Sequence, residues 1–594
     1  MASRRTTICT SSVIAAVLVI GALSPTAVRA QGFGDYPVIY RPAKGAKDLR
    51  AVLFNWTWYM GMLRGVDEHE LITSLEYQGK GSLQVDGQPC TLTKYRVSTN
   101  YQYPGQRVQY TCTKPNGQTV SNIEVVHGFY AWDEDIPGAE IVAGKGKATP
   151  MPGAVEERLI RLWASPQGAP KAAIAGVEGV APNTKLGDNP GTLVKDGVDK
   201  AGQTSLAWEN GKAVVTYPIP GVPGAIATAT LNDKYMAERV VVKHAGKTTE
   251  FTYGDYQDWN NPLNKVDALY AGKISESHNG AVVRDLTTTQ TETGSVYVVM
   301  PVPASVRAAI HTAEQPTPAL ERLEASERAV PRVAGSLAQL SNDDPVTPRL
   351  ANGHPDLSGN WNFNGMNWRY GNRRCDPTQQ EGCSRALNQT MDFEFEAPSR
   401  FGPSRPLYKP EFWDKIQELD MWTNKDDPVM TCQPLGNPRQ GPPRRIVQSA
   451  NDIIFFYTQY ADGGGGNNEY RIIPTDGRKH DEKKAIEATY YGYTVGTWQG
   501  DTLVLDSISF VDTTWLARGG FFHSDQMHVI EKLTRKGDKI LYEVTVEDPE
   551  SLVEPWVMTP RVLTLSNFPD AGLISERGNC EVYELKDITS QIRH

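Results

Sequence analysis

Alternation of apolar and polar residues, broken by short turn dipeptides, is the feature that most restricts the fold of this chain. From Gly81 to Val126 the alternation is interrupted at Asp86-Gly87, Pro104-Gly105 and Asn116-Gly117. Alternation with a period of two predicts strands with one buried face, and Asp-Gly or Asn-Gly between two such runs predicts a hairpin. The same pattern returns between residues 205 and 300 and between residues 445 and 565. We therefore expect a mainly β, β-rich α+β protein built from antiparallel sheets.

Helical spacing is confined to short stretches. Apolar residues recur at helical spacing from Leu49 to Leu63, from Val155 to Trp163 and from Glu411 to Trp422. Residues 313–352 are rich in Ala, Glu, Arg and Pro with few large apolar side chains, which is typical of a linker or a solvated helical arm, and the domain boundary is expected there. The second strand-rich region contains many short strands separated by turn signals, and this spacing favours a closed or nearly closed antiparallel barrel.

The first thirty residues have the three parts of an export signal. Arg4-Arg5 supplies the positive start, Val13 to Leu23 the apolar stretch, and Val28-Arg29-Ala30 the small-residue cleavage site. The apolar stretch is shorter than the ~20 residues that span a bilayer. We expect export to the periplasm or the medium after cleavage near Ala30, with an uncleaved anchor as the alternative.

Charge and composition restrict the partners. The chain has 60 Lys and Arg against 69 Asp and Glu, a formal net charge of −9, and no run of basic residues. This balance argues against nucleic acid and against anionic membrane surfaces as partners. No later apolar stretch is long enough for stable membrane insertion. A small-molecule ligand is therefore the expected partner, and an envelope protein is a second candidate.

Six cysteines remain once the signal peptide with Cys9 is removed, and an even number in an oxidising compartment predicts disulfides. Connectivity cannot be deduced from sequence alone. Proximity favours Cys90–Cys112 and Cys375–Cys383, which leaves Cys432–Cys580. The alternative, a metal held by thiolates, requires clustered C-x-x-C spacing, and the sequence has none.

A set of motifs in the second strand-rich region carries a resemblance to a known family. The set comprises P-D-L-S-G-x-W, T-D-G-R, G-x-W-x-G-D-T-L-V-x-D-x-x-x-F, H-S-[DE]-Q-x-H-V-x-E and Y-E-V-T-x-[DE]-D-P. These motifs occupy Pro355–Trp361, Thr475–Arg478, Gly496–Phe510, His523–Glu531 and Tyr542–Pro549. Over residues 353–584 the chain resembles a large, mostly uncharacterised family of secreted bacterial proteins.

This resemblance implies a late disulfide between Cys432 and Cys580 but no established activity. The chain departs from the family at Asp462–Asn468, where a glycine run replaces aromatic and charged strand residues. The first strand-rich region is similar in strand order to the half-barrel of lipoprotein carriers. The expected organisation is a signal peptide (1–30), a half-barrel-like domain (31–312), a linker (313–352) and a lipocalin-like barrel domain (353–594).

The segment His523–Glu531 is the most function-like part of the sequence. On a continuous strand, His523, Asp525 and Glu531 would share one face, together with Met527 and Val529. His523 is then a candidate base, Asp525 its orienting carboxylate, and Arg471 or Tyr493 a group that holds an oxyanion. His523 and Asp525 are alternatively two metal ligands that need a third from elsewhere. The structural alternative is a solvated strand end with a hydrogen-bonded histidine.

Other residue types favour either a site or ordinary structure. Asp501, Asp506, Asp512, Asp548, Glu550 and Glu554 are carboxylates for acid/base chemistry or turn residues. The aromatic residues Trp361, Trp368, Tyr490, Tyr491, Tyr493, Trp498 and Trp515 suit a flat ligand or a barrel core. Arg471 and Arg478 are candidate carboxylate clamps or members of salt bridges. The Gly463–Gly466 run is a lid or a hairpin tip.

Motifs of common enzyme classes are absent from the sequence: G-x-S-x-G, H-E-x-x-H, the P-loop, G-x-G-x-x-G after a strand and C-x-x-C-H. No cofactor is indicated. We therefore expect an exported two-domain β protein that binds a small hydrophobic, aromatic or sugar-like ligand in a barrel cavity. The alternative is an acid/base enzyme, a hydrolase, lyase or isomerase, with a His/Asp site in the C-terminal barrel.

Overall fold

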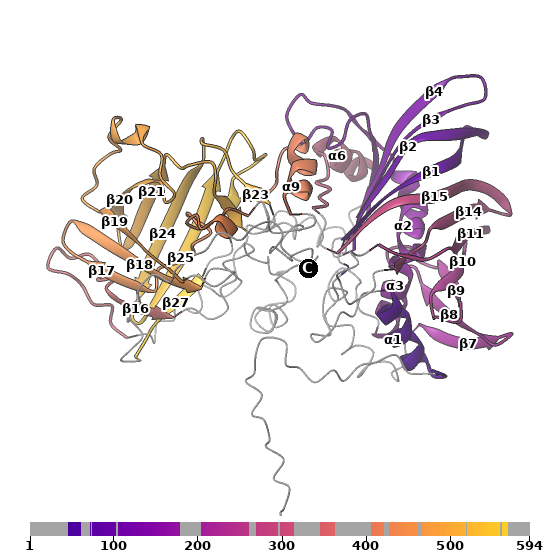
Figure 1. Cartoon of the computed structure of the whole chain (residues 1–594), viewed down its shortest axis with the longest axis horizontal. Helices are drawn as coiled ribbons and strands as arrows, with labels where there is room; N and C mark the ends of the chain where they lie inside the picture. The colour runs from indigo at the N-terminus through magenta and orange to yellow at the C-terminus, as the bar shows by residue number, and fades with distance from the viewer. Residues whose placement is uncertain are drawn as a thin grey trace, which may run out of the picture.

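A computed structural model describes residues 45–60, 72, 74–101, 105–178, 203–259, 269–294, 297–313, 345–362, 406–420, 427–460, 466–517, 520–558 and 561–567. These residues form two large antiparallel sheets that lie side by side (Figure 1). The expected mainly β fold is confirmed. The expected signal peptide, Cys375, Cys383, Cys580, Trp368 and most of the expected linker and glycine run lie outside the described residues.

The first sheet has thirteen strands in the order β6-β5-β4-β3-β2-β1-β15-β14-β11-β10-β9-β8-β7. Their bounds are β1 (Ser74–Val85), β2 (Gln88–Asn100), β3 (Gly105–Thr113), β4 (Thr119–His127), β5 (Tyr130–Glu134), β6 (Ala148–Pro150), β7 (Ser205–Glu209), β8 (Lys212–Pro218), β9 (Ile226–Leu231), β10 (Ala237–His244), β11 (Lys247–Gly254), β14 (Lys273–His278) and β15 (Ala281–Gly294). Asp86 and Gly87 both have positive φ in the β1–β2 turn, as the Asp-Gly signal predicts.

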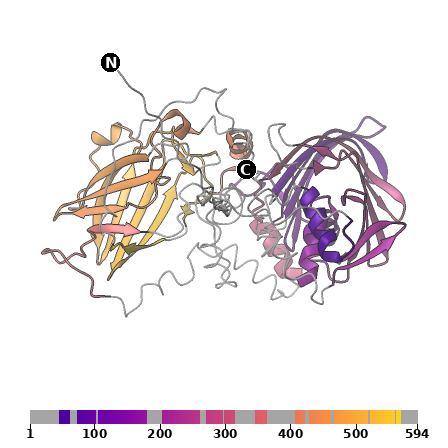
Figure 2. The same cartoon turned by 60° about the horizontal axis from the view of Figure 1, so that its bottom comes forward.

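Three helices cover the concave face of this sheet: α1 (Leu49–Tyr59), α2 (Val155–Ala164) and α3 (Gly168–Glu178). Figure 2 shows the strands curving around these helices. The first core lies between the two layers; Trp56 of α1 and Trp163 of α2 are buried in it against the strand side chains. Burial of large apolar side chains contributes roughly 1.5–3 kcal/mol each, so this packing holds the helices inside the curve.

A disulfide links β2 to β3. Cys90 and Cys112 are bonded with their Cα atoms 5.5 Å apart, which confirms the expected pairing. Cys432 is also disulfide-bonded, and its partner lies outside the described residues.

The second sheet runs in the order β19-β18-β17-β16-β27-β25-β24-β21-β20, with β26 paired to β25. The bounds are β16 (Gly359–Asn362), β17 (Arg445–Gln448), β18 (Asp452–Tyr460), β19 (Gly466–Pro474), β20 (Tyr493–Gln499), β21 (Thr502–Ile508), β24 (His528–Lys536), β25 (Lys539–Glu547), β26 (Trp556–Val557) and β27 (Arg561–Leu565). Two small two-stranded sheets pair β12 (Gln257–Asp258) with β13 (Leu269–Tyr270) and β22 (Trp515–Ala517) with β23 (Phe521–Phe522).

The two edge strands of the second sheet approach each other, so the sheet is a nearly closed barrel. After β19 the backbone N–H of Gly477 donates to the carbonyl of Gly496 in β20 at 3.2 Å. A side chain at Gly496 would come within 3.0–3.1 Å of Thr475 and Leu505, so glycine permits this approach.

The two domains contact each other through α9 (Trp413–Asp420), which follows a 3-10 turn at Pro410–Phe412. The helix expected from Glu411 to Trp422 therefore begins later, at Trp413, and its described part ends at Asp420. The Arg107 guanidinium of β3 lies 4.8 Å from the Trp413 ring centre, and Arg96 of β2 binds Asp414 at 2.7 Å. Tyr297, which follows β15, is buried in the second core. The two cores therefore share side chains across the interface.

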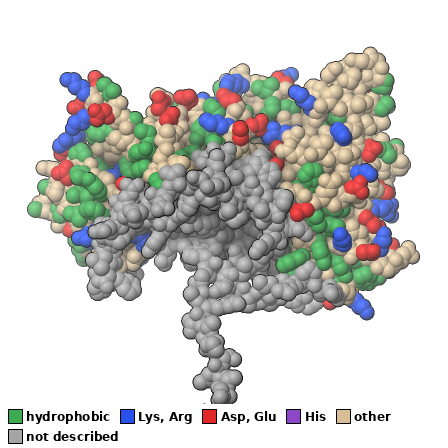
Figure 3. Space-filling view, in the orientation of Figure 1, with side chains coloured by type: hydrophobic (Ala, Val, Ile, Leu, Met, Phe, Trp, Pro, Cys, Tyr) green, Lys and Arg blue, Asp and Glu red, His purple; other side chains and the backbone are tan. Residues whose placement is uncertain are grey.

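The remaining described parts are the end of the expected linker and the helix α6. Residues 345–352, the described end of the expected linker, contact the second domain, where Arg349 binds Asp501 at 2.6 Å. The helix α6 (Ala304–Ala313) lies beside β5 and β6. Figure 3 shows acidic and basic side chains interspersed over the described parts of both domains. No helix in the described ranges is both long and apolar enough to cross a membrane.

Candidate functional sites

A pocket lies in the first domain between the concave face of the sheet and the connection from α2 to α3. Its apolar lining consists of aromatic rings from strands and strand ends: Tyr77, Tyr101, Phe251, Tyr253 and Tyr270. Its charged lining consists of Arg161 of α2, Glu276 of β14 and Arg284 of β15. Strand alternation explains the arrangement, because residues two apart, such as Phe251 and Tyr253, point to the same face.

The aromatic rings are fixed by contacts with each other and with the helices. The Tyr253 hydroxyl donates to the Ala164 carbonyl at 2.8 Å, and the rings of Tyr77 and Tyr270 are 5.2 Å apart. The Tyr101 hydroxyl lies 3.3 Å from that of Ser165. In this arrangement the pocket has about 20 Å³ of free space. That is close to the space one water molecule needs.

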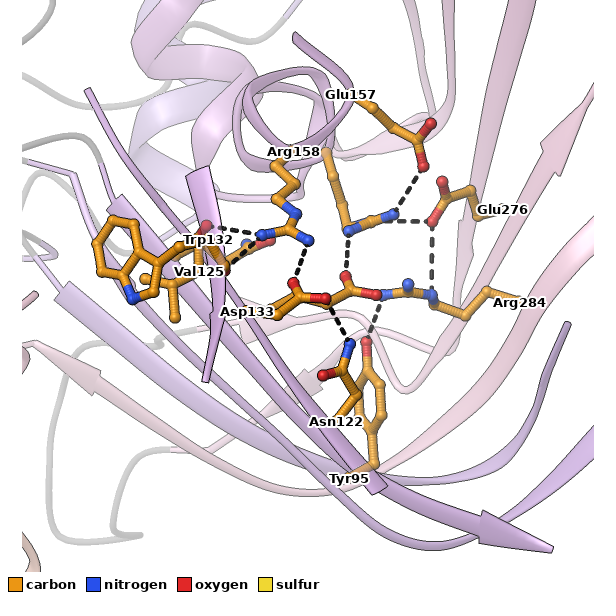
Figure 4. A network of polar contacts seen from close by, with 12 residues as sticks. Tyr95, Asn122, Val125, Trp132, Asp133, Glu157, Arg158, Glu276 and Arg284 are labelled. Atoms are coloured by element: carbon orange, nitrogen blue, oxygen red, sulfur yellow. Dashed lines mark hydrogen bonds and ion pairs between the residues drawn. The ribbon is translucent and has the colours of Figure 1, made fainter. Parts of the chain in front are cut away.

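A network of charged groups forms the polar side of the pocket (Figure 4). The Arg161 guanidinium binds three carboxylates: Glu276 at 3.2 Å, Glu124 at 3.1 Å and Glu157 at 3.4 Å. Arg284 donates through Nη1 to the Tyr95 hydroxyl at 2.7 Å, and its Nε lies 3.5 Å from Glu276. Arg161 is thus surrounded by acceptors, whereas Arg284 makes only one close hydrogen bond within this network.

The protonation states of the pocket follow from burial and from these ion pairs. Burial raises the pKa of Glu276, but Arg161 and Arg284 outweigh it and hold that pKa far below its usual range. Burial raises the pKa of Tyr77, Tyr253 and Tyr270 well above the usual value. At neutral pH the pocket therefore presents neutral tyrosine hydroxyls beside a charged Arg–Glu–Arg group.

The second domain has a buried polar group inside the barrel, and it contains two of the predicted site residues. Arg471 of β19 and Glu531 of β24 form an ion pair of 2.8 Å, and they are 5% and 0% exposed. Glu531 also accepts from the Tyr542 hydroxyl at 2.7 Å and from the Asn437 amide at 3.0 Å. Arg471 donates to the Thr494 hydroxyl of β20 at 2.8 Å. These bonds tie β19 to β20, β24 and β25 across the interior.

His523 and Asp525, by contrast, do not come together. The strand begins only at His528, and Asp525 lies exposed in the preceding turn, where it accepts from the Gln526 amide at 2.9 Å. The expectation of one continuous strand from His523 to Glu531 is therefore corrected: only its part from His528 onward is strand. Asp548, not Asp525, is the carboxylate that bonds to the segment next to His523. It accepts from the Ser524 backbone N–H at 2.7 Å and from the Ser524 hydroxyl at 2.8 Å.

The His523 imidazole is buried with both nitrogens bonded. Nδ1 lies 2.9 Å from the Ser524 carbonyl, and Nε2 lies 2.7 Å from the Thr514 hydroxyl. A carbonyl only accepts, so Nδ1 carries the proton and Nε2 accepts from Thr514. Burial lowers the pKa of His523, so the ring is neutral and its basic nitrogen is occupied.

Tyr493 lies on the outer side of the barrel, away from Arg471. Its ring packs 4.9 Å from that of His480, and its hydroxyl accepts from the Asp481 backbone at 3.2 Å. The remaining aromatic candidates are also dispersed: Trp361 and Trp515 belong to the core, and Trp498 stacks on His354. Arg478 forms an exposed ion pair with Asp476.

The charged residues of the first-domain pocket were not singled out from the sequence. A usable signal existed, because Glu276 alternates with Ile274 on the buried face of β14, and a carboxylate at such a position needs a buried partner. The partner Arg161 lies in a distant helix, and sequence alone does not indicate that pairing.

No protein-family model matches the chain, and no curated protein matches it. The resemblance of residues 353–584 to a family of secreted bacterial proteins therefore stays a prediction.

Proposed function

We propose that the chain is an exported binding protein that holds a small hydrophobic, aromatic or sugar-like molecule in the pocket of its first domain. The supporting observation is the lining of that pocket, in which five aromatic rings face the Arg161–Glu276–Arg284 group. Aromatic rings supply flat apolar surface, and a few fixed polar groups orient the ligand. The disulfide between Cys90 and Cys112 is compatible with export.

The charged lining favours a ligand with one anionic or strongly polar group. Arg161 already binds three carboxylates, so it has little capacity for another acceptor. Arg284 lies 3.5 Å from its carboxylate partner, so its guanidinium is the better donor to a ligand. Guanidinium groups bind carboxylates and phosphates through paired hydrogen bonds. We therefore propose an apolar or aromatic body against the tyrosines and a polar group at Arg284.

Entry of such a ligand requires the pocket to widen. Its free space of about 20 Å³ is far below the volume of a molecule with an aromatic ring. We expect the connection between α2 and α3 to shift, because Ser165 and Pro166 line the pocket and the hydroxyls of Tyr101 and Tyr253 bond to Ser165 and Ala164. Binding would thus be coupled to separation of the α2–α3 connection from Tyr101 and Tyr253.

Native and denaturing mass spectrometry of the exported protein, purified without added ligands, tests this proposal. We expect a releasable organic mass on the wild type. Ile274→Trp fills the pocket and should abolish that mass, whereas Val282→Trp, at a position 53% exposed, should keep it. Failure to find any bound mass, or equal retention by both variants, would count against the proposal.

The alternative of an acid/base enzyme in the second domain has weaker support. Asp525 does not contact His523, and the basic nitrogen of His523 is occupied by Thr514. If the alternative is correct, His523→Gln should abolish turnover in a screen of hydrolase, lyase and isomerase substrates while the protein still folds.

A further inference from the structure

We propose that the second domain binds a divalent transition metal of the Zn²⁺ type through His480, Asp506 and His528. Glu547 then serves as a positioning residue. This site is on the outer side of the barrel, and the proposal is independent of the pocket in the first domain. Metal binding would explain why β21, β24 and β25 carry polar side chains at this end of the barrel.

The geometry brings two imidazoles to one carboxylate oxygen. His480 Nε2 and His528 Nε2 each lie 3.0 Å from Asp506 Oδ1. Zinc binds histidine nitrogen and carboxylate oxygen at about 2.0–2.2 Å, so neighbouring ligands of a tetrahedral ion are about 3.3 Å apart. Each nitrogen is thus within a few tenths of an ångström of the required distance to the oxygen. The two nitrogens are more than 4.8 Å from each other, so both rings must turn before one ion can bind all three side chains. Water would complete the coordination.

A second carboxylate fixes the ring of His528. Glu547 Oε2 lies 3.0 Å from His528 Nδ1, and the two residues are directly opposite each other on β24 and β25. A carboxylate on the far nitrogen of a ligating histidine sets the tautomer and the orientation of the ring. With Nδ1 donating to Glu547, Nε2 faces Asp506. An ion there would replace the Nε2 protons that donate to Asp506 without it.

The charge of the group also suits a dication. Without a metal, His528 donates from both ring nitrogens to carboxylates, so metal binding must release its Nε2 proton. With the rings neutral in the bound state, Asp506 and Glu547 give the ligand group a charge of about −2. In the described part of the chain, neither carboxylate forms an ion pair with Lys or Arg. The more compact set Glu157, Glu276 and His278 differs in this respect, because Arg161 and Arg284 already neutralise its carboxylates. A cation at that set would be repelled.

The chain segments that meet here are distant in sequence but adjacent in the barrel. His480 follows β19, Asp506 lies on β21, and His528 and Glu547 are the first residue of β24 and the last of β25. The barrel pairs β21 with β24 and β24 with β25, so these positions gather at one end. The Tyr493 ring packs against the His480 ring, with the ring centres 4.9 Å apart.

Calorimetric titration of Zn²⁺ into the full-length exported protein, after treatment with EDTA, tests the site. We expect about one ion per chain and affinity at least ~10-fold weaker in His528→Gln, His480→Gln and Asp506→Asn. His244→Gln is the matched control, since His244 also pairs with an exposed carboxylate, Glu156, at 2.9 Å. This variant should bind Zn²⁺ with the affinity of the wild type.

A second readout separates binding at this site from adventitious binding. Co²⁺ in a site with two imidazoles and a carboxylate gives visible absorption bands, and these should disappear in His528→Gln but persist in His244→Gln. Thermal melts of the metal-free variants show whether each one folds. A wild type that binds no stoichiometric Zn²⁺, or folded variants that bind like the wild type, would overturn the proposal.

Discussion

At the residue scale, the buried ion pair Arg471–Glu531 illustrates how this barrel tolerates charge in its interior. Each partner has hydrogen bonds beyond the ion pair, to Tyr542 and Asn437 on one side and to Thr494 on the other. Desolvation of two charges costs several kcal/mol per ion, and such a pair persists only when the remaining hydrogen-bonding groups are satisfied. The pair is therefore a cross-link of the barrel whose members depend on each other.

We predict strong coupling between these two residues. Glu531→Gln or Arg471→Met alone should lower the free energy of unfolding by about 3–5 kcal/mol, because each leaves one buried charge without its partner. The double variant should lose much less than the sum of the two single losses. Urea unfolding followed by fluorescence measures this, with Arg478→Met as a control at an exposed ion pair. Additive losses would show that the pair is not coupled.

A second residue-scale prediction concerns pH. Burial lowers the pKa of His523 from the ordinary 6.5, so the unfolded chain binds a proton at this residue more readily than the native chain. Stability from the neutral ring is present above the unfolded pKa and is lost as pH falls through it. The melting temperature of the wild type should fall between about pH 7.5 and pH 5.5, and His523→Gln should weaken that dependence.

The comparison for this pH effect is His354→Gln, because His354 stacks on Trp498 near the surface. The change in slope should be larger in His523→Gln, which removes a buried ring, than in His354→Gln. An unchanged slope in His523→Gln would assign the acid sensitivity to other groups.

At the element scale, the local parts of the fold were predictable from the sequence and the long-range pairings were not. Asp86-Gly87 has the positive φ values of a tight hairpin turn, and the sequence pattern indicates it directly. Pairing of β1 with β15 joins residues about two hundred positions apart, for which no local pattern exists. The same limit applies to the sites. Arg471 and Glu531 were singled out, but their contact depends on the curvature of the second sheet. The contact of Arg161 with Glu276 depends on the packing of α2 on β14. Asp525 was misplaced because a turn interrupts the apparent alternation.

Gly81 in β1 is a position where we predict a large effect of one methyl group. Gly81 has φ +142°, and a Cβ there would lie 2.0 Å from the Asp285 carbonyl oxygen of β15. Gly81→Ala should therefore lower the free energy of unfolding by about 2 kcal/mol or more. Gly87→Ala, at φ +69° with no atom within 4 Å of the added Cβ, shares the backbone strain without the overlap. Chemical denaturation should show a larger loss for Gly81→Ala; equal losses would contradict the assigned overlap.

At the scale of the whole molecule, the two domains form one unit because side chains of each complete the packing of the other. Trp413 of α9 lies under the Arg107 guanidinium, and Gly138 leaves space for that ring, since a Cβ at Gly138 would come within 2.8 Å of it. In the other direction, Tyr297 donates to the Pro406 carbonyl at 2.9 Å inside the second core. Such an interface couples the stabilities of the domains.

We predict that Trp413→Ala uncouples the two domains. Calorimetry of the wild type should give one cooperative transition, and the variant should give two, because the largest ring of the contact is removed. Trp498→Ala is the control, since it removes a tryptophan of the second domain at its stacking contact with His354. This variant should shift the transition without splitting it. A wild type that already unfolds in two steps would refute the coupling.

The pairing of β1 with β15 also determines when the first domain can finish folding. β15 joins strands β1 to β6 to strands β7 to β11 and β14, and it is the last strand of this sheet to be synthesised. Pairings between distant parts of a chain are slow because loop closure precedes any favourable contact. Until residues 281–294 have been synthesised and have paired, both β1 and β14 present open edges. Those edges can pair with other chains. We therefore expect aggregation, or binding by a chaperone, to be easiest before β15 has paired.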